Sequence, residues 1–435
     1  MTVTTPLYAM VNRLGQLALR EGTKPFPQSH FELLQTLDQL RLMVETPTET
    51  VLRLIYQVQR STGEFDKSIL DLTDFLQPPQ NAALRTVIDL GIFPLLMEKQ
   101  NRDVGLSAAQ LAEKTGADPD LIGMAHALGN SCGNDKLLSM VRTDSGLHTP
   151  TTEVYCANDK TPALTQPIGR DGVPCIYDLT VPTLSKLPEY LRTHDYINPQ
   201  EYAHSPMQWA VGQSQFEWLA NNKQHQALFN SYMASRRQGR PMWFDVYPVE
   251  RLLGHATPCE DSVFLVDVGG NKGHDLSRFR QRYSHLPGRM VLQDLPKVVE
   301  GVSGRDGGID VMGYSFLDPQ PVQGARAYYF RAIFHDWPDH ICQQILRNTI
   351  AAMAPDYSRI LIVDFVLPDT DAPLMQAALD IQMMSIGAGV ERSERQWKDL
   401  LHSVGLEIAG VWKQSPAMES IIEVVPIKNS VAGTR

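Results

Sequence analysis

The sequence of 435 residues contains only five cysteines, an odd number, and no two of them form a C-x-x-C pair. Cysteines spread this widely predict reduced thiols in a cytoplasmic protein and argue against a disulfide framework or a zinc site. No apolar run approaches the ~18 residues that suggest a membrane span. The first residues also lack the charged and apolar regions of a signal peptide.

An excess of positive charge is missing as well. The lysines and arginines number 39 and the acidic residues 49, which gives a formal net charge of -10. Nucleic acids and anionic membranes both require a basic surface, so neither is expected as the main partner. No group of acidic and histidine residues has the spacing of metal ligands, and no metal is expected.

One stretch in the second half of the chain has a clear ligand-binding pattern. An apolar run, residues 264–268, leads into Gly269 and Gly270, then into a helical segment and a second apolar run, residues 290–293. This order predicts a strand, a tight turn, a helix and a parallel return strand. The glycines let the backbone turn sharply and approach a ligand closely. Asp294 is placed to accept hydrogen bonds from ribose hydroxyls, so we expect an adenosine ligand.

The pattern around this stretch alternates between strands and helices. Strands are expected near Phe264, Met290, Ala327 and Arg359, and helices near Leu276, Val298 and Asp339. Such alternation predicts an α/β fold with a mostly parallel sheet covered on both faces. Ligands bind such sheets at the carboxyl ends of the strands. Residues 407–412 and 420–425 predict two further strands at an antiparallel edge.

The N-terminal part is predicted to be helical. Residues 31–60 carry apolar side chains at helical spacing, which fits core helices of the same chain as well as helices that pair with a second copy. A helix is expected over residues 82–97 and another over 108–115, capped by Ser107 and followed by a polar hairpin up to residue 156. This order is typical of a winged helix, a fold that often binds DNA. The acidic balance argues against DNA here.

Four motifs then point to a family. In chain order they are V-D-V-G-G-N-K-G-H, V-L-Q-D-L-P, H-D-W-P-D and V-E-R-S-E-R-Q-W. On these motifs the chain, over roughly residues 80–425, resembles the class I S-adenosylmethionine-dependent O-methyltransferases of the plant caffeate and flavonoid type, especially fungal relatives acting on aromatic polyketides. The resemblance implies a Rossmann-like methyltransferase sheet, S-adenosyl-L-methionine as cofactor, a phenolic substrate and a homodimer. It also implies a winged-helix-like dimerisation and pocket-wall domain over residues 1–205 and a catalytic domain over residues 206–435.

Methyl transfer to a phenol needs a base, because a phenol with a pKa of ~10 is little ionised at neutral pH. His335 follows a strand directly, and an imidazole with an ordinary pKa of about 6.5 can accept that proton. The resemblance places two carboxylates, Glu391 and Asp364, where they could hold the other ring nitrogen. The family commonly has glutamate at the position of Asp364, so Glu391 is the preferred partner. Alternatively, Glu391 forms a solvated ion pair with Arg392 or Arg395, and Asp364 caps a helix or faces the ribose.

The resemblance also implies a set of cofactor contacts: Gly269, Gly270, Asp294, Tyr314, Ser315, Phe316 and Arg331. Tyr314 and Ser315 stand where the family often has Asp-Met, so stacking and a hydroxyl would have to replace the usual adenine contacts. Asn271 replaces a third glycine, and asparagine tolerates a positive φ better than most residues. Arg331 could equally pair with Asp336.

Aromatic residues gather between Trp209 and Trp243, a pattern that fits both a core and the wall of a pocket for a flat aromatic guest. The resemblance favours a substrate role for Met233, and Met383 is expected to pair with it. Two alternatives stay open. One is a nicotinamide dehydrogenase on the same sheet, against which the turn D-V-G-G-N-K-G speaks, and the other is a catalytically silent methyltransferase-like dimeric scaffold.

Overall fold

The computed structural model describes residues 6–23, 77–102, 104–122, 139–142, 153–158, 160–235, 241–253, 262–302, 308–370, 372, 374–413 and 418–428, with scattered residues between 36 and 49. Contacts between Cα atoms divide the chain into two compact units. The first comprises Met1–Leu179 and Lys223–Arg236, and the second comprises Thr180–Asn222 and Arg237–Arg435. The predicted domain boundary after residue 205 falls inside the second unit.

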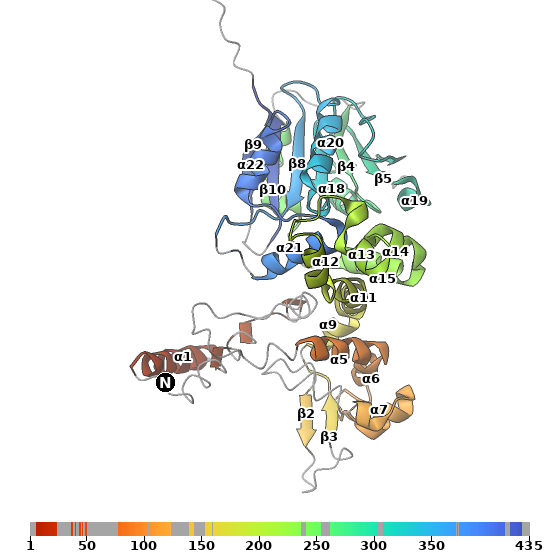
Figure 1. Cartoon of the computed structure of the whole chain (residues 1–435), viewed down its shortest axis with the longest axis vertical. Helices are drawn as coiled ribbons and strands as arrows, with labels where there is room; N and C mark the ends of the chain where they lie inside the picture. The colour runs from red at the N-terminus through yellow and green to blue at the C-terminus, as the bar shows by residue number, and fades with distance from the viewer. Residues whose placement is uncertain are drawn as a thin grey trace, which may run out of the picture. The chain divides into compact units, whose positions relative to one another are not determined.

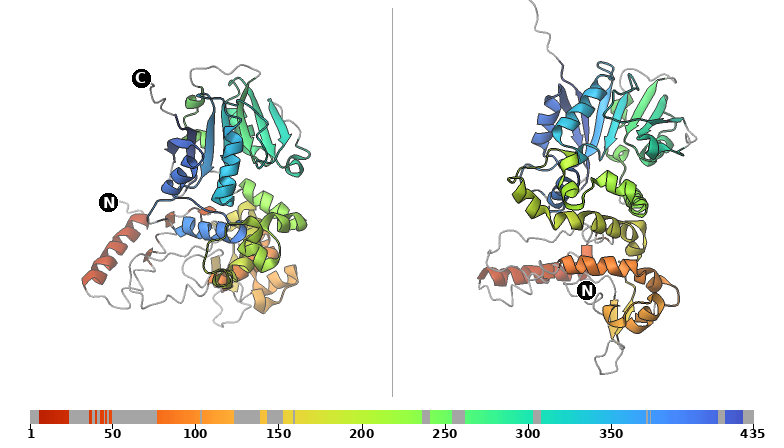
Figure 2. Two further views of the ribbon diagram at one scale, coloured as in Figure 1. Left: turned by 45° about the horizontal axis from the view of Figure 1, so that its top comes forward. Right: turned by 45° about the vertical axis from the view of Figure 1, so that its right-hand side comes forward.

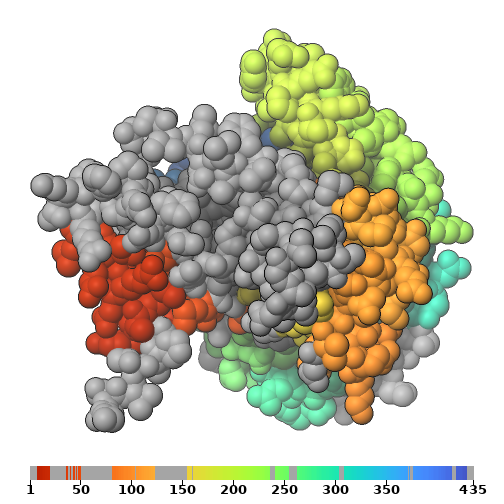
Figure 3. Space-filling model, turned by 90° about the horizontal axis from the view of Figure 1, so that it is seen from below, coloured from red at the N-terminus to blue at the C-terminus, as the bar shows by residue number. Residues whose placement is uncertain are grey.

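The first unit is mainly helical (Figure 1). Its described helices are α1 (Pro6–Thr23), α5 (Gln77–Asp89), α6 (Ile92–Met97), α7 (Ala108–Thr115), α9 (Thr161–Thr165), α10 (Pro167–Arg170), the first part of α11 (Gly172–Leu184) and α15 (Lys223–Ser235). Strands β1 (Leu106–Ser107), β2 (Ser139–Arg142) and β3 (Glu153–Cys156) form an antiparallel sheet in the order β1-β3-β2. Helices α5 to α7 are seen as the orange surface in Figure 3.

Local predictions for the first unit had mixed outcomes. Ser107 caps α7 as predicted, because its hydroxyl accepts the Gln110 N–H and the Gln110 side chain accepts the Ser107 N–H. The predicted hairpin is the antiparallel pair β2 and β3. The single helix predicted over residues 82–97 is wrong, because Gly91 takes a left-handed conformation with φ of 67° between α5 and α6. Most of the helix pair predicted over residues 31–60 lies outside the described residues.

The second unit is built around one sheet. Along the chain, α12 (Leu187–Thr193), η1 (Tyr202–His204), α13 (Pro206–Val211), α14 (Gln215–Asn221), α16 (Trp243–Val246) and α17 (Glu250–Leu253) precede it. The sheet region contains β4 (Val263–Val268), α18 (His274–Arg282), β5 (Arg289–Asp294), α19 (Pro296–Val299), β6 (Ile309–Gly313), β7 (Ala327–Arg331), η2 (Phe334–Asp336), α20 (Asp339–Ile350), β8 (Arg359–Asp364), α21 (Leu374–Gly387), α22 (Glu394–His402), β9 (Leu406–Trp412) and β10 (Ser420–Pro426).

The strand order in this sheet is β6-β5-β4-β7-β8-β10-β9. The first five strands are parallel, and β10 runs antiparallel to both β8 and β9. The predicted parallel strands are therefore confirmed as β4, β5, β7 and β8, and the predicted antiparallel edge as β9 and β10. Strand β6 was not predicted. Three of its five residues, Ile309, Val311 and Met312, are apolar, but only Ile309 is buried, because β6 lies at the edge of the sheet.

Helices cover both faces of the sheet, as Figures 1 and 2 show. Side chains of each strand alternate between the two faces, so that on β7 Tyr328 and Phe330 pack with Ile345 of α20 and Trp397 of α22. Tyr329 packs on the opposite side, in the cluster that contains residues of α16 and α18. The structure is thus the predicted doubly covered α/β sheet. Of the described helices, none combines the length and the apolar composition needed to cross a bilayer.

Candidate active site

Five parallel strands bring the predicted site residues to one edge of the sheet. At the carboxyl ends lie Gly269 after β4, Asp294 on β5, Gly313 on β6, Arg331 on β7 and Asp364 on β8. After β4 the chain adds β5 and β6 on one side and then crosses over to add β7 and β8 on the other, so the strand order reverses at β4. A crevice for a ligand forms at such a reversal in open parallel sheets.

The turn after β4 is tied to the next strand by its backbone. The N–H groups of Gly269 and Gly270 both donate to the carbonyl of Gln293, at 2.8 and 3.1 Å. A Cβ on Gly269, where φ is 75°, would lie 2.5 Å from the Ile333 side chain. A Cβ on Gly270 would lie 2.5 Å from the carboxylate of Asp267. The turn therefore requires glycine for its own packing, before any ligand is considered.

Asp294 is held by two backbone amides. Its Oδ2 accepts the N–H of Asn271 at 2.8 Å, and its Oδ1 accepts the N–H of Leu295 at 2.7 Å. Asn271 has a φ of 53°, the positive value that was expected of it. Burial raises the pKa of Asp294, and the two amide hydrogen bonds offset part of this effect. Each carboxylate oxygen keeps a lone pair that can accept a further hydrogen bond.

The segment after β6 continues this edge. The N–H of Tyr314 donates to the carbonyl of Asp294 at 2.8 Å, and its hydroxyl donates to the carbonyl of Asp318 at 2.8 Å. The ring of Phe316 meets that of Trp337 edge to face, with centroids 6.0 Å apart. The segment from Tyr314 to Phe316 is thereby fixed between the carboxyl end of β5 and Trp337, which follows the η2 turn.

Arg331 is buried in an ion-pair network. Its guanidinium lies 2.6 Å from Oδ2 of Asp275 and 2.6 Å from Oε2 of Glu419. Burial alone would lower the pKa of Arg331, but the neighbouring carboxylates outweigh it and raise that pKa well above the ordinary value. The structure thus pairs Arg331 with Asp275 and Glu419, where Asp336 had been considered. Its cofactor contact stays a prediction.

His335 and Glu391 form a buried dyad. They are 56 positions apart in sequence, yet Nδ1 of His335 lies 2.7 Å from Oε1 of Glu391. His335 sits in the η2 turn, and Glu391 lies in the connection between α21 and α22. Both side chains are buried, with 8% and 1% of their surface exposed. The N–H of Val390 also donates to the carbonyl of His335 at 2.9 Å, so backbone and side chains both join the two segments.

The surroundings of His335 favour its positive form. Burial by itself would lower the pKa of His335, but the carboxylates of Glu391, Asp336 and Asp364 outweigh it and raise the pKa to about 10. Glu391 acts both through its charge and through its hydrogen bond. His335 in this environment is therefore a stronger base than an ordinary imidazole.

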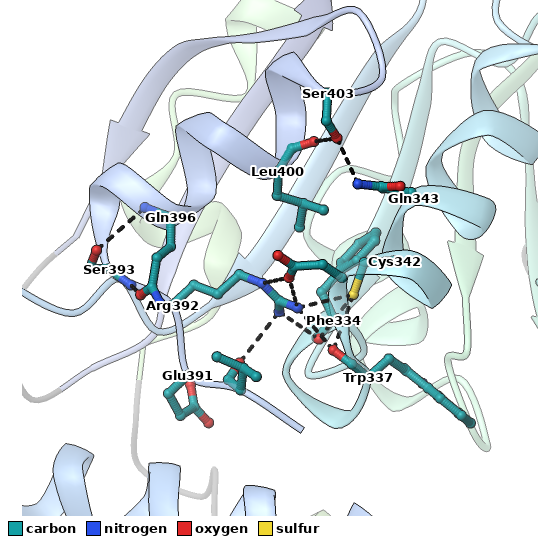
Figure 4. A network of polar contacts seen from close by, with 12 residues as sticks. Phe334, Trp337, Cys342, Gln343, Glu391, Arg392, Ser393, Gln396, Leu400 and Ser403 are labelled. Carbon is teal, nitrogen blue, oxygen red and sulfur yellow. Dashed lines mark hydrogen bonds and ion pairs between the residues drawn. The ribbon is translucent and has the colours of Figure 1, made fainter. Parts of the chain in front are cut away.

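The predicted alternative for Glu391, a surface ion pair with its neighbour, is wrong. Arg392 is itself buried, and its Nη2 lies 2.7 Å from Oδ1 of Asp339. Figure 4 shows the side chains of Glu391 and Arg392 leaving the backbone in different directions. In this non-helical connection, Glu391 thus contacts His335, while the adjacent Arg392 contacts Asp339.

Asp364 lies at the end of β8 and is buried, with 2% of its surface exposed. Burial raises the pKa of Asp364 to about 7, although the charge of His335 pulls in the opposite direction. Among the residues that the structure describes, Oδ2 of Asp364 and Oε2 of Glu391 are buried without a hydrogen-bond partner. Buried polar atoms are rarely left in this state, and they mark places where a ligand can bind. The cap role considered for Asp364 finds no support in these contacts.

The sequence and the fold match known proteins. A family model described as an O-methyltransferase domain matches residues 197–407. Methyltransferase cfoC of Aspergillus candidus is 35% identical over 79% of this chain and 82% of its own length. Demethylsterigmatocystin 6-O-methyltransferase of Aspergillus parasiticus is 34% identical over 80% of this chain and 86% of its own length. The chain belongs to the S-adenosylmethionine-dependent O-methyltransferases.

Solved structures with the same fold carry the cofactor of this family. LepI in complex with SAM superimposes with a TM-score of 0.74 at 28% identity, over 97% of this chain and 98% of that one. OxaC in complex with sinefungin and meleagrin has a TM-score of 0.72 at 26% identity, over 97% and 99% of the two chains. The predicted cofactor, S-adenosylmethionine, is thereby confirmed. A nicotinamide dehydrogenase is not supported.

The residues of this O-methyltransferase fit such a cofactor. The turn at Gly269 and Gly270 keeps side chains away from the end of β4, since any Cβ there would collide with the chain itself. Asp294 lies on the adjacent strand with acceptor capacity for ribose hydroxyls. The donor set therefore suits a nucleoside at the ends of β4 and β5.

The two predicted substrate methionines lie in different units. Met383 is buried on α21, a helix that packs against the η2 turn carrying His335. Met233 lies on α15 and packs against the core of the first unit. Whether they face one substrate stays a prediction.

The aromatic segment of this O-methyltransferase is partly exposed. Tyr232 and Trp243 are core residues, but Trp209 and Phe216 are 41% and 44% exposed. The ring of Phe216 stacks on Tyr202, whose ring lies 5.2 Å from that of Trp337. The sequence analysis did not predict the contact of Tyr202 with Trp337, because residues this far apart in the chain form no recognisable pattern.

A buried amide pair was also missed. Gln293 and Gln320 exchange hydrogen bonds of 2.8 and 2.9 Å through their side chains. Gln293 immediately precedes Asp294, so the pair anchors the end of β5 to the chain that follows the Tyr314 segment. Two glutamines 27 positions apart carry no recognisable pattern, and only the fold reveals them.

Proposed function

We propose that the protein transfers a methyl group from S-adenosylmethionine to a phenolic hydroxyl of an aromatic secondary metabolite of the polyketide class, with His335 as general base. The observation that carries this proposal is the buried contact of 2.7 Å between Nδ1 of His335 and Oε1 of Glu391 at the carboxyl edge of the sheet. The relative named for 6-O-methylation of demethylsterigmatocystin supports a hydroxyl acceptor on a metabolite of this kind.

In this proposal His335 removes the proton of the acceptor hydroxyl. With Nδ1 engaged by Glu391, Nε2 is the nitrogen that accepts the proton. Glu391 holds the ring in that orientation and stabilises the imidazolium that forms. The raised pKa of about 10 is close to the ~10 of a phenol, so proton transfer to neutral His335 is nearly balanced. At neutral pH only the small unprotonated fraction of His335 can accept the proton. When bound, S-adenosylmethionine supplies the methyl group, and its sulfonium charge disfavours a second positive charge nearby.

Asp364 is proposed as the second carboxylate of the catalytic set. Because its pKa is raised to about 7, both the protonated and the ionised form of Asp364 are populated near neutral pH. Its unpartnered Oδ2 can accept a hydrogen bond from, or donate one to, a group brought in by the substrate. Asp364 therefore complements Glu391, which already holds His335.

The cofactor would be held along the ends of β4, β5 and β6. Gly269 and Gly270 would admit it to the backbone, and Asp294 would accept hydrogen bonds from the ribose. The adenine would be flanked by Tyr314, Ser315 and Phe316. The guanidinium of Arg331, at the end of β7, would lie near the cofactor.

The first unit is proposed to serve the acceptor and a second subunit. Met233 of this unit and Met383 of the second unit are each proposed as contacts of the acceptor, since thioethers adapt to a flat aromatic ring. The predicted domain of residues 1–205, winged-helix-like in its pattern, would dimerise. The small antiparallel sheet and the capped helix α7 are compatible with that assignment.

The proposal is tested by incubating the protein with labelled S-adenosylmethionine and a panel of phenols, thiols and amines, followed by mass analysis of the products. We expect a methylated phenol and S-adenosylhomocysteine in equal amounts. Binding of S-adenosylhomocysteine without turnover of any phenol, thiol or amine in the panel would instead favour the silent scaffold. Methylation of a thiol or an amine alone would reject the phenolic acceptor.

A further inference from the structure

Arg392 is the most completely buried cation near the dyad, with 1% of its side chain exposed. Burying a charge is unfavourable unless the charge is paired and its donors are hydrogen-bonded. The partners of Arg392 therefore indicate what its burial achieves.

The guanidinium of Arg392 spans the turn that carries His335. Its Nη1 donates to the carbonyl of Phe334 at 2.8 Å, and its Nη2 donates to the carbonyl of Trp337 at 2.9 Å. These two carbonyls stand on either side of His335 in sequence. The Nε and Nη2 atoms also contact Oδ1 of Asp339, the first residue of α20. Figure 4 shows these contacts converging on one guanidinium.

The same arginine adjoins Glu391 in the chain, so it joins the two segments that carry the dyad. Both segments contain an unfavourable backbone conformation. Ala332 has a φ of 52° and Ala388 a φ of 58°, values that alanine rarely adopts. Each stands three positions before a member of the dyad. Such conformations persist only where surrounding contacts hold them.

We propose that Arg392 is a positioning residue, which fixes the turn of His335 and the connection of Glu391 at the separation their contact requires. The inference rests on the proposed function of His335 and Glu391. Arg392 acts through carbonyl oxygens and Asp339, and its role is separate from that of the dyad side chains.

An arginine is required because the contacts diverge. A planar guanidinium presents five N–H donors in a fixed fork, whereas a lysine ammonium is a point charge at the end of a flexible chain. A lysine at this position keeps the charge and the ion pair with Asp339. It cannot bridge the carbonyls of Phe334 and Trp337 with the same geometry.

The test compares Arg392→Lys with Arg395→Lys, because Arg395 lies three residues further on and is exposed. Arg392→Lys should lower kcat by about 10- to 100-fold, as expected for a small displacement of catalytic groups. KM for both substrates and the affinity for S-adenosylhomocysteine should change by less than about twofold. Arg395→Lys should leave kcat within about twofold of the parent.

A double-mutant cycle separates positioning from general damage. In the Glu391→Gln background, Arg392→Lys should lower kcat by less than about threefold, because the contact it positions is already altered. An equal loss in both backgrounds would overturn the proposal, as would a parental kcat for Arg392→Lys. A parental rate for His335→Ala would instead reject the proposed base, whatever the outcome for Arg392.

A second variant covers the case in which Arg392→Lys does not fold. Asp339→Asn removes the ion pair at an exposed carboxylate and leaves the carbonyl contacts in place. It should lower kcat by about threefold with unchanged KM, and the loss should disappear in the Glu391→Gln background. An unchanged kcat, or a loss that persists in that background, would reject the positioning role.

Discussion

The carboxyl edge of the sheet has two halves, which we call the cofactor half and the catalytic half after their proposed roles, and they satisfy their polar atoms differently. In the cofactor half, residues 269–271 with Asp294, the chain supplies its own partners, and both oxygens of Asp294 accept backbone N–H groups. In the catalytic half, His335, Asp364 and Glu391, two buried carboxylate oxygens have no hydrogen-bond partner within the described part of the chain. The pKa values of His335 and Asp364 are also raised, to about 10 and about 7.

This difference indicates that the two halves prepare for ligands in different ways. The cofactor half is complete in the free protein, so changes there should act on stability and cofactor affinity. The catalytic half keeps two buried carboxylate oxygens without a partner beside groups with raised pKa values, a combination typical of functional sites. Changes there should act on rate and on pH dependence.

The largest effect is expected from His335→Ala. Removing a positioned general base should lower kcat by about 10³-fold, while the affinity for S-adenosylhomocysteine changes by less than about twofold. Initial rates with labelled S-adenosylmethionine and calorimetric titration measure the two quantities. The exposed His340 on α20 provides the matched control, and His340→Ala should behave like the parent. If His335→Ala kept the parental rate, the catalytic half would have no base.

Asp364→Asn should sharpen the comparison through pH. The pKa of Asp364 is raised from 3.8 to about 7, mainly by burial. A raised pKa contributes stability that is fully present below the unfolded value and is lost as pH rises through the folded value. Asparagine has no such dependence. The free energy of unfolding of the variant, relative to the parent, should therefore increase by roughly 3 kcal/mol between about pH 4 and about pH 8.

Urea unfolding at both pH values measures this change. The control is Asp369→Asn, an exposed carboxylate five residues further along the chain. Its difference from the parent should stay constant within about 0.5 kcal/mol. The same constancy for Asp364→Asn would mean that this carboxylate ionises with an ordinary pKa. The contrast between the two halves would then rest on the unpartnered oxygens and on His335.

Gly269→Ala should have a smaller effect, on stability. Gly269 and Gly301 have nearly equal φ values of 75° and 73°, but a Cβ would meet Ile333 only at Gly269, and nothing within 4 Å at Gly301. Gly301→Ala should cost about 1 kcal/mol for its backbone conformation alone. Gly269→Ala should cost about 2 kcal/mol, because the methyl group also displaces Ile333. Equal losses of stability in thermal unfolding would show that Ile333 can move aside for a methyl group at Gly269.

Much of the fold followed from the sequence, because apolar strands and polar turns repeat clearly over residues 263–364. Strand β6 was missed because it is only five residues long, and its place at the edge of the sheet could not be known from the sequence. The break at Gly91 was missed because the apolar spacing continues on both sides of a single left-handed residue. Periodicity reports which side chains are buried, and it does not report where the backbone changes direction.

The site was predictable only in part. His335 and Glu391 are 56 positions apart, and no local pattern joins them, so the family resemblance was needed to pair them. The adjacent Glu391 and Arg392 suggested a surface ion pair, yet the first contacts His335 and the second contacts Asp339. In a connection without helical turns, consecutive side chains can point to opposite sides. Charge adjacency in sequence was therefore misleading here.

The consecutive placement of Glu391 and Arg392 has a consequence for the length of their connection. Deleting one residue between Ala388 and Glu391 would bring Arg392 into the place of Glu391, beside the ring of His335. It would also bring Ser393 into the place of Arg392, so the carbonyl oxygens of Phe334 and Trp337 would lose their guanidinium donor. One attraction would become a repulsion, and the other contact would be lost. A change in the length of this connection would alter both contacts at once, so the spacing of the two charges matters as well as their identity.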